Sequence, residues 1–194
     1  MINGYSQTLL DDAFINNDIR VKFLTKINKN TQKLSLLIDK LRLSIKLDEK
    51  TLVPTFSDIN IYTLVEQSIE DIKQNFKDRK VLLRGNKTLM IKADQTLIEV
   101  AIVNLIENAL KYSEDDVYVL IDEQSIHIKD DGFGISKAEI EKITKKFYRV
   151  SNNNWDNSLG LGLSIVSNIL NLHHFKLEIK STVNTSSTFT IHFS

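Results

Sequence analysis

The sequence predicts an α+β protein: a helical hairpin followed by an α/β sandwich, in which helices cover one face of a mixed sheet. Residues 18–48 repeat apolar side chains at three- and four-residue steps without glycine or proline, a pattern typical of one long helix. The single proline, Pro54, ends that pattern. Beyond it, strand and helix patterns interleave, and many strands are too close in sequence for crossovers.

Composition limits the function classes that the chain can serve. Lys plus Arg and Asp plus Glu both number 25, and this balance argues against a nucleic-acid-binding surface. The chain has no cysteine, which excludes disulfides and thiolate metal sites. No apolar run reaches the length of a membrane span. We divide the 194 residues into a hairpin, 1–53, and a second domain, 54–194.

The hairpin carries one strong apolar stripe. Residues 2–12 are predicted to end a first helix, with a polar turn around 16–18 before the long second helix. Two such helices have too little core alone, which leaves two possibilities open: a dimeric four-helix bundle through residues 1–48, or packing of the hairpin on its own domain. The stripe consists of Leu34, Leu37, Ile38, Leu41 and Ile45.

The second domain is predicted in chain order from its periodicity. Asp94 is a suitable N-cap for the helix that follows it, and Ser136 with Glu139 has the pattern of a capping box. Residues 81–85 and 89–93 are predicted to pair as neighbouring strands. Strands are expected at 54–60, 81–85, 89–93, 117–122, 125–131, 176–181 and 187–193, and helices at 61–80, 94–112, 137–147 and 159–174.

The helix over 94–112 carries an unusual polar stripe, because asparagine is a poor residue for a helix interior. Asn104, Asn108 and Lys111 are spaced four and three apart and share one side of the helix. Amide oxygens suit a hard cation such as Mg²⁺, and a lysine suits the phosphates that such a cation binds. The alternative is a solvated polar face. The apolar residues expected to face the sheet are Ile98, Ile102, Leu105, Ile106 and Ala109.

Four of the six glycines form two G-x-G pairs, Gly132 with Gly134 and Gly160 with Gly162. The first pair follows Asp130, which would place a carboxylate at the end of a strand. The second pair opens a helix, where bare amide groups could bind an anion. A surface turn and an ordinary helix start are the alternatives.

Between the glycine pairs, the segment over 146–158 is polar and contains Arg149 and Trp155. We predict that it is a lid with a phosphate-binding guanidinium, or else a plain surface loop.

In this order the four motifs resemble those of the ATP-binding catalytic domain of sensor histidine kinases, within the gyrase, Hsp90 and MutL-like ATPases. NLIENALKYS (104–113) looks like the N box, DDGFGIS (130–136) like the first glycine box, KFYRV (146–150) like the F box and LGLGLSIV (159–166) like the second. The resemblance covers 55–194, and the hairpin is similar to the family's dimerisation and phosphotransfer hairpin. The family's phospho-accepting histidine segment would precede Ile2, so we expect Met1 to begin a shortened form of a longer protein.

The resemblance implies that the chain binds ATP with Mg²⁺. Asn108 would coordinate the metal with support from Asn104, and Lys111 and Arg149 would contact phosphates as catalytic groups. Tyr112 would line the site and Asp130 would accept the adenine amine. The remaining implied binding residues are Gly132, Gly134, Ile135, Phe147, Gly160, Leu161, Gly162 and Leu163.

The implied reaction transfers the γ-phosphoryl group to a histidine absent from this chain, for relay to an aspartate of a response-regulator receiver domain. The resemblance places the domain in the cytoplasm as part of an inner-membrane sensor, attached only through upstream segments. His127, His173, His174 and His192 are expected to be structural. Alternatives are a degenerate nucleotide-binding or dimerisation scaffold and an ATPase of the gyrase or MutL kind.

Two departures from the family pattern affect these expectations. Ser158 and Leu159 stand where the family usually has a glycine and a small residue, and HHFKL (173–177) lacks a usual turn glycine.

Overall fold

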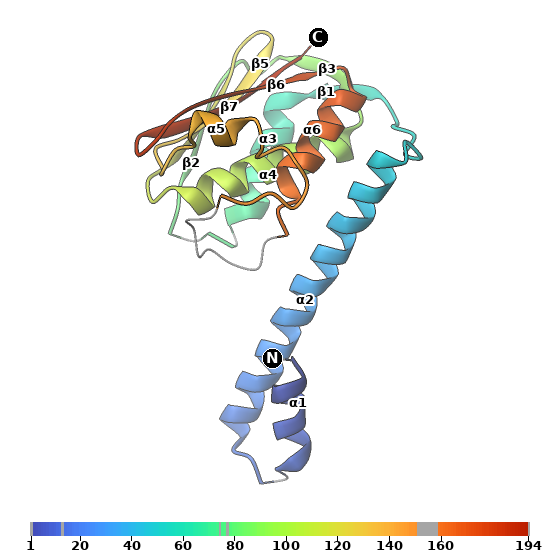
Figure 1. Ribbon diagram of the computed structural model, residues 1–194, viewed down its shortest axis with the longest axis vertical. Coiled ribbons are helices and arrows are strands. Elements are labelled where there is room, and N and C mark those ends of the chain that lie inside the picture. Colours follow the sequence, from blue (N-terminus) through green and yellow to red (C-terminus); the bar gives the residue numbers. More distant parts are fainter. Residues whose placement is uncertain (1, 13, 74, 77, 151–158, 194) are drawn as a thin grey trace. The chain divides into compact units, whose positions relative to one another are not determined.

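A computed structural model describes residues 2–12, 14–73, 75–76, 78–150 and 159–193 (Figure 1). The chain forms two compact units, Met1–Leu43 and Ser44–Ser194. The boundary that we predict between functional domains, at residues 53 and 54, stays a prediction. Among the described residues, no helix combines the length and the apolar character needed to cross a membrane.

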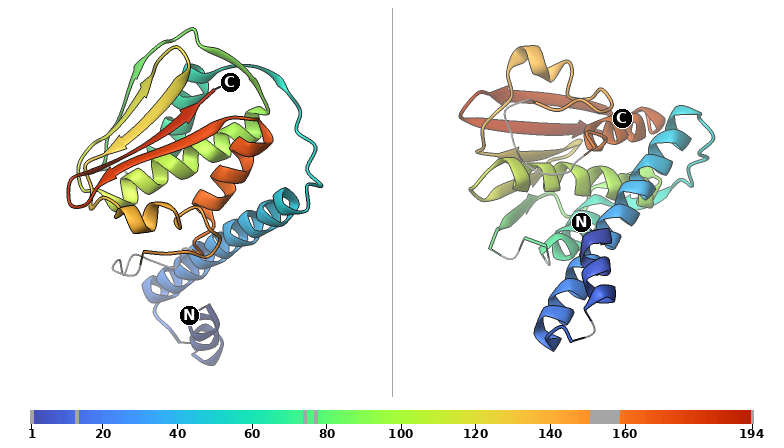
Figure 2. Two further views of the ribbon diagram at one scale, coloured as in Figure 1. Left: turned by 45° about the horizontal axis from the view of Figure 1, so that its top comes forward. Right: turned by 60° about the horizontal axis from the view of Figure 1, so that its bottom comes forward.

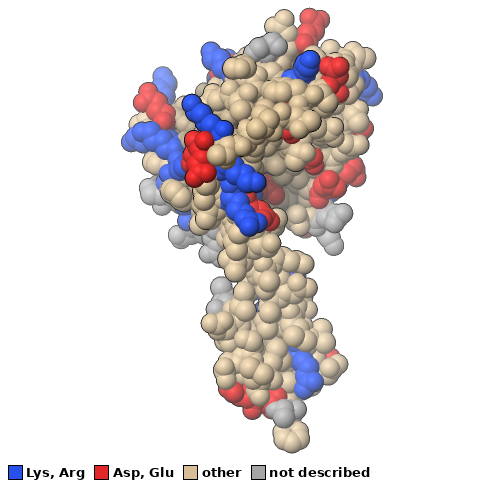
Figure 3. Space-filling model, turned by 90° about the vertical axis from the view of Figure 1, so that its right-hand side faces the viewer, with Lys and Arg blue, Asp and Glu red and all other residues tan. Residues whose placement is uncertain are grey.

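The first unit contains α1 (Ile2–Asp11) and most of α2 (Asn17–Asp48), which confirms the two predicted helices. The Tyr5 ring lies 5.0 Å from the Phe23 ring and joins the two helices. Leu34 and Ile38 of the predicted stripe are 51% and 48% exposed, and no described residue of α1 is buried. Few charged side chains occupy the face of this unit that is seen in Figure 3. Dimerisation through this stripe stays a prediction.

The second unit is built on a mixed five-stranded sheet of order β2-β4-β5-β7-β6. β2 and β4 are parallel, and the other neighbours are antiparallel. Helices α3, α4 and α6 lie together on one face (Figure 2), as predicted. The strands are β2 (Val81–Gly85), β4 (Val117–Ile121), β5 (Ser125–Asp130), β6 (Lys176–Thr182) and β7 (Ser186–His192), and the helices α3 (Ile61–Lys73), α4 (Gln95–Tyr112), α5 (Lys137–Ile140) and α6 (Gly162–Leu172).

The predicted pairing of residues 81–85 with 89–93 is wrong. β3 (Met90–Ala93) pairs instead with β1 (Ser57–Asn60) in a separate two-stranded sheet, and β2 pairs with β4. Gly85 has a φ of +118°, and a Cβ there would lie 1.9 Å from the Ile121 carbonyl oxygen. The chain therefore turns away from a simple hairpin at the end of β2, in a conformation that only glycine adopts readily.

Three predicted helices are shorter than expected. α3 ends at Lys73 rather than residue 80, and α6 begins at Gly162 rather than residue 159. α5 ends at Ile140, although its start is as predicted because the Glu139 carboxylate accepts a hydrogen bond from the Ser136 N–H at 3.3 Å.

Helix α4 is the centre of the core, because it packs against α3, α6 and the sheet. Its apolar side chains Ile98, Ile102, Leu105 and Ile106 have no exposed surface. Strand β4 alternates strictly between buried and exposed positions, with its buried residues on the helix side. Burial of this face is the main stabilising contribution to the unit.

The N-terminus of α4 is held by side chains from distant segments. Asp94 caps the helix, since its Oδ1 accepts from the Leu97 N–H at 3.1 Å, and its Oδ2 accepts from the Thr55 N–H at 2.8 Å. The Asp94 N–H donates to His173 Nε2 at 3.0 Å, and His173 Nδ1 donates to the Ile169 carbonyl at 2.7 Å. His173 is 4% exposed, so it links α4 to the end of α6, which confirms its structural role.

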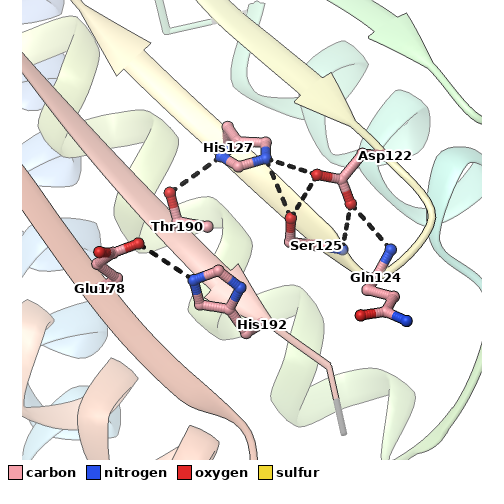
Figure 4. A network of polar contacts seen from close by, with 7 residues as sticks. All are labelled: Asp122, Gln124, Ser125, His127, Glu178, Thr190 and His192. Atoms are coloured by element: carbon pink, nitrogen blue, oxygen red, sulfur yellow. Dashed lines mark hydrogen bonds and ion pairs between the residues drawn. The ribbon is translucent and has the colours of Figure 1, made fainter.

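The opposite face of the sheet carries a polar network around two histidines (Figure 4). His127 Nε2 lies 2.9 Å from Asp122 Oδ2, and its Nδ1 lies 3.0 Å from Thr190 Oγ1. His192 Nε2 lies 3.2 Å from Glu178 Oε2. Burial raises the pKa of Asp122, but hydrogen bonds from His127, Ser125 and Gln124 together bring it far below its usual value. These contacts tie neighbouring strands together and support the prediction that both histidines are structural.

We expect Asp94→Ala to lower the free energy of unfolding by about 1–2 kcal/mol, because the N-cap and the Thr55 contact are both lost. Asp94→Asn is the matched control, since its amide oxygen still caps the helix and the loss should be smaller. Urea denaturation of the two variants measures the difference. Equal stabilities of Asp94→Ala and the unchanged chain would contradict the capping role.

Candidate functional site

The polar stripe of α4 has one buried and two partly exposed members. Asn104 is 5% exposed, and its Nδ2 donates to the Val100 carbonyl one turn earlier at 2.7 Å. Asn108 is half-buried. Lys111 pairs with Glu107, with 3.4 Å between Nζ and Oε2, and its side chain is 41% exposed. Asn104 therefore has a packing role, while Asn108 and Lys111 remain accessible.

The buried amide of Asn104 meets the second glycine pair. A Cβ placed on Gly162 would lie 3.1 Å from Asn104 Oδ1, tighter than an ordinary van der Waals contact. Helix α6 begins at Gly162, and no side chain caps it. Among the residues that the structure describes, the first amide groups of α6 therefore have neither an intrahelical nor a side-chain partner. Glycine at 162 lets α4 approach these amides closely, which places Asn104 beside a helix start of the kind that can bind an anion.

The first glycine pair lies at the end of β5, beside the end of α4. A Cβ on Gly132 would lie 2.1 Å from the Tyr112 carbonyl oxygen, and the Phe133 N–H donates to that oxygen at 3.3 Å. Gly134 has a φ of +64°, and a Cβ there would lie 2.1 Å from the Thr182 carbonyl oxygen. The loop is thus pressed between α4 and the β6–β7 turn, where no larger residue fits.

Asp130 ends β5 as a buried carboxylate. It is 3% exposed, and its Oδ1 accepts from the Gly132 N–H at 3.1 Å. Burial raises its pKa to about 6, although the hydrogen bond from Gly132 opposes the rise. A buried acceptor that is only partly satisfied by its own loop is suited to take a hydrogen bond from a ligand's N–H group.

The segment after α5 closes on the second glycine pair. Phe147 has a φ of +60°, and its N–H donates to the Gly160 carbonyl at 3.0 Å. Gly160 has a φ of +66°, and a Cβ there would lie 2.7 Å from the Tyr148 carbonyl oxygen. These contacts hold together the two ends of the segment between Phe147 and Gly160. Residues 151–158 of the lid predicted over 146–158, which include Trp155 and Ser158, lie outside the described residues.

The structure thus joins all four motifs through backbone and amide contacts. Tyr112 meets the first glycine loop, Asn104 meets Gly162, and Phe147 meets Gly160. Leu161 is 2% exposed and packs into the core, whereas Leu163 and Ile135 are half-buried. Arg149 is exposed, and its predicted approach to a phosphate stays a prediction.

Magnesium fits the donors that the site offers. Within the described ranges, no group of three or more His, Cys, Asp or Glu residues could hold a metal ion. Asn108 instead offers a single neutral oxygen donor, half-buried and one turn of α4 beyond the residue that meets Gly162. Mg²⁺ characteristically takes few protein ligands and completes its shell with water and substrate phosphates.

Two residues that support the site were not predicted from the sequence. Glu107 pairs with Lys111, and the i, i+4 spacing could have revealed it. Ser181 Oγ accepts from the Ile135 N–H at 2.8 Å and so supports the first glycine loop, a contact that depends on strand register. His174, which the sequence places in the segment that lacks a turn glycine, has a φ of +60° and adopts the left-handed conformation that glycine would favour.

A family model described as histidine kinase-, DNA gyrase B- and HSP90-like ATPase matches residues 93–194, which include all four motifs. The phosphate regulon sensor protein PhoR of Pseudomonas aeruginosa is 28% identical over 204 residues, covering 100% of this chain and 46% of its own length. The heme sensor protein HssS of Staphylococcus saprophyticus is 33% identical over 185 residues, covering 91% of this chain and 40% of its own. The chain thus spans less than half the length of these relatives.

Solved structures share the fold. The Acinetobacter baumannii histidine kinase AdeS superposes with a TM-score of 0.78 at 21% identity, covering 100% of this chain and 92% of that one. Full-length ShkA in complex with AMPPNP superposes with a TM-score of 0.76 at 19% identity, covering 98% of this chain and 42% of that one. From the family match over more than half of its residues, the chain belongs to the histidine kinase-, DNA gyrase B- and HSP90-like ATPase family.

Proposed function

We propose that this chain is the ATP-binding catalytic portion of a sensor histidine kinase. The observation that carries the proposal is the convergence of the four motifs through the Tyr112–Gly132, Asn104–Gly162 and Phe147–Gly160 contacts. Similarity to sensor proteins such as PhoR and HssS along the whole chain, rather than over the ATPase domain alone, favours this branch of the family.

The base of the nucleotide would bind at the end of β5. Asp130 would accept a hydrogen bond from the adenine amine, because it is a buried carboxylate with one partner from its own loop. Gly132 and Gly134 keep the surrounding backbone free of side chains, and Tyr112 adjoins the same loop. A charged acceptor in a buried place gives a stronger bond than a neutral one, which would favour adenine over bases without that amine.

The phosphates would lie between α4 and the start of α6. The uncapped amides at Gly162 and Leu163 supply donors, and the helix dipole adds a favourable field. Asn108 would hold Mg²⁺, which bridges phosphate oxygens and neutralises their charge. Lys111 would exchange Glu107 for a phosphate oxygen, and Arg149 would approach the terminal phosphate from the segment that follows Phe147.

In the proposed reaction, the lone pair of an imidazole nitrogen attacks the γ-phosphorus while the bond to the β–γ bridging oxygen breaks. ADP leaves with the electron pair, and the imidazole loses its proton to solvent. The residues of this chain contribute position and charge rather than covalent chemistry. The acceptor would be a histidine outside this chain, as the family resemblance implies, and His127, His173 and His192 are engaged in structural contacts.

The partners follow from the proposed chemistry. Phosphohistidine would pass its phosphoryl group to an aspartate of a receiver domain, and the exposed stripe on α2 would pair two copies of the chain. ATP and receiver domains are cytoplasmic, so we place the domain there. A hydrolytic ATPase would need an acidic residue to activate water, where this chain has Asn104.

Mutation of the proposed metal ligand tests the magnesium assignment. We expect Asn108→Ala to weaken Mg-ADP binding by at least about tenfold, because a direct ligand is lost. Without Mg²⁺, the variant and the unchanged chain should bind ADP equally. Calorimetry with and without Mg²⁺ measures the ADP affinity of the variant and of the unchanged chain. Asn171→Ala, at an exposed position of α6, is the matched control. Equal loss with and without Mg²⁺ would remove Asn108 from the metal site.

Asp130 should show a trade-off between stability and binding. Its raised pKa means that the charged form destabilises the unliganded fold above pH 6, and that stability is regained as pH falls through 6 toward the unfolded value. We expect Asp130→Asn to stabilise the chain at pH 7 by about 1–3 kcal/mol, since about two pKa units are removed. It should also weaken ADP binding by about tenfold, since the charged acceptor is lost.

Thermal unfolding between pH 5 and 7.5, together with ADP titrations, tests the Asp130 prediction. The stability gain of Asp130→Asn should shrink as pH falls below 6, and ADP binding to the unchanged chain should weaken over the same range. Asp58→Asn is the control, because Asp58 is exposed and lies in β1 of the separate two-stranded sheet. A stability gain that is independent of pH would contradict the buried-charge argument.

Phosphoryl transfer can be tested in trans. We expect the chain, mixed with radiolabelled ATP and a longer homologous protein that has both a hairpin with an acceptor histidine and its own ATP-binding domain, to produce an acid-labile, base-stable phosphoprotein. The acceptor protein should itself carry Asn108→Ala at the equivalent position, so that only the present chain supplies catalysis. Steady release of inorganic phosphate without a phosphoprotein would favour the hydrolytic alternative.

A further inference from the structure

The last residue of α2 holds two parts of the second unit together. Asp48 Oδ2 forms an ion pair with Lys146 Nζ, and Asp48 Oδ1 accepts a hydrogen bond from Asn168 Nδ2 at 3.3 Å. Asp48 belongs to the compact unit Ser44–Ser194, as do both partners. One carboxylate therefore joins three segments that are far apart in sequence.

Both partners of Asp48 adjoin the proposed phosphate site. Lys146 immediately precedes Phe147, whose N–H donates to the Gly160 carbonyl at 3.0 Å. Asn168 lies in α6, the helix that presents its uncapped start at Gly162. A displacement of Asp48 would therefore displace the segment around Phe147. It would also displace helix α6, whose first amides would bind the phosphates.

The burial of two side chains shows that this end of α2 is packed against the rest of the second unit. Ser44 is 3% exposed and Leu47 is 9% exposed, although most of α2 is solvated. The side chains of Asp48 and Lys146 are 43% and 30% exposed, so the ion pair alone is a weak source of stability. The ion pair matters for position rather than for stability. The buried residues Ser44 and Leu47 fix where α2 ends, and Asp48 then connects that end to α6 and to Lys146.

We propose that Asp48 is a positioning residue that couples the end of α2 to the nucleotide site through Lys146 and Asn168. This inference rests on the proposed function, because it concerns the affinity of that same site. Coupling is reciprocal: if the Asp48 contacts favour the arrangement that binds nucleotide, bound nucleotide must stabilise the end of α2 to the same extent.

The experiment uses the full chain and Mg-ADP. We expect Asp48→Asn and Lys146→Met each to weaken Mg-ADP binding about three- to tenfold, the size typical of modest coupling. The double variant should bind no more weakly than either single variant, because both changes break one contact. The charge exchange Asp48→Lys with Lys146→Asp should recover part of the affinity. Glu49→Gln, at the exposed neighbouring position, is the matched control and should bind normally.

Hydrogen exchange separates coupling from simple stability. In the unchanged chain, Mg-ADP should increase amide protection over residues 44–51, and Asp48→Asn should abolish that increase even where the variant remains folded. Failure of the unchanged chain to bind Mg-ADP would overturn the proposed function itself. Normal binding by Asp48→Asn, with an unchanged protection response, would overturn only the coupling.

Discussion

Close backbone approach at four glycines is the constraint on which the proposed site depends. Gly132 and Gly134 lie against the carbonyl oxygens of Tyr112 and Thr182, and Gly160 lies against that of Tyr148. Gly162 lies against the amide of Asn104. In each case the neighbour comes from another segment, so a side chain at any of these positions would push two segments apart. A chain with six glycines uses four of them here, where the loops must meet.

The close approach at Gly162 means that the two asparagines of α4 differ in burial and in role. Asn104 is buried, and its amide is oriented by the Val100 carbonyl so that its oxygen faces Gly162. Asn108 lies one turn further on and is half-buried. An asparagine can serve in both places because its short amide both donates and accepts within a helix. The inner residue supports the distance between α4 and α6, and the outer one remains available to a cation.

The sequence predicted local structure well where the pattern itself carries the physical cause. The alternation in 117–121 reflects one buried face, and Asp94 can cap its own helix without help from elsewhere. The pairing of 81–85 with 89–93 failed for a different reason. Closeness in sequence favours a hairpin, but the φ of Gly85 and the parallel register of β2 with β4 depend on tertiary contacts. Neither has a local signature.

The same holds for the site: its motifs could be predicted from the sequence, but the residues that support them depend on tertiary contacts. The motif order located α4, the two glycine pairs and Phe147, because backbone requirements appear in the sequence as glycines and helix starts. The residues that support these motifs were not predicted, because they contact the motifs from segments that are distant in sequence. Ser181 reaches the first glycine loop only through the β6–β7 register, and Asp48 reaches Lys146 only through the position at which α2 ends. Side chains that hold a loop in place have no preferred spacing from it.

Asp130 and Lys111 are two charged groups that the proposed nucleotide would contact. Burial raises the pKa of Asp130, which means that its charge lacks sufficient partners, and Lys111 is satisfied by Glu107 at 3.4 Å. A ligand with an amine at one end and phosphates at the other would give Asp130 a donor and Lys111 a stronger anion. Lys111 immediately precedes Tyr112, whose carbonyl oxygen contacts the first glycine loop, and Asp130 ends the strand that leads into that loop. In the proposed complex, a nucleotide would give both groups a partner at once.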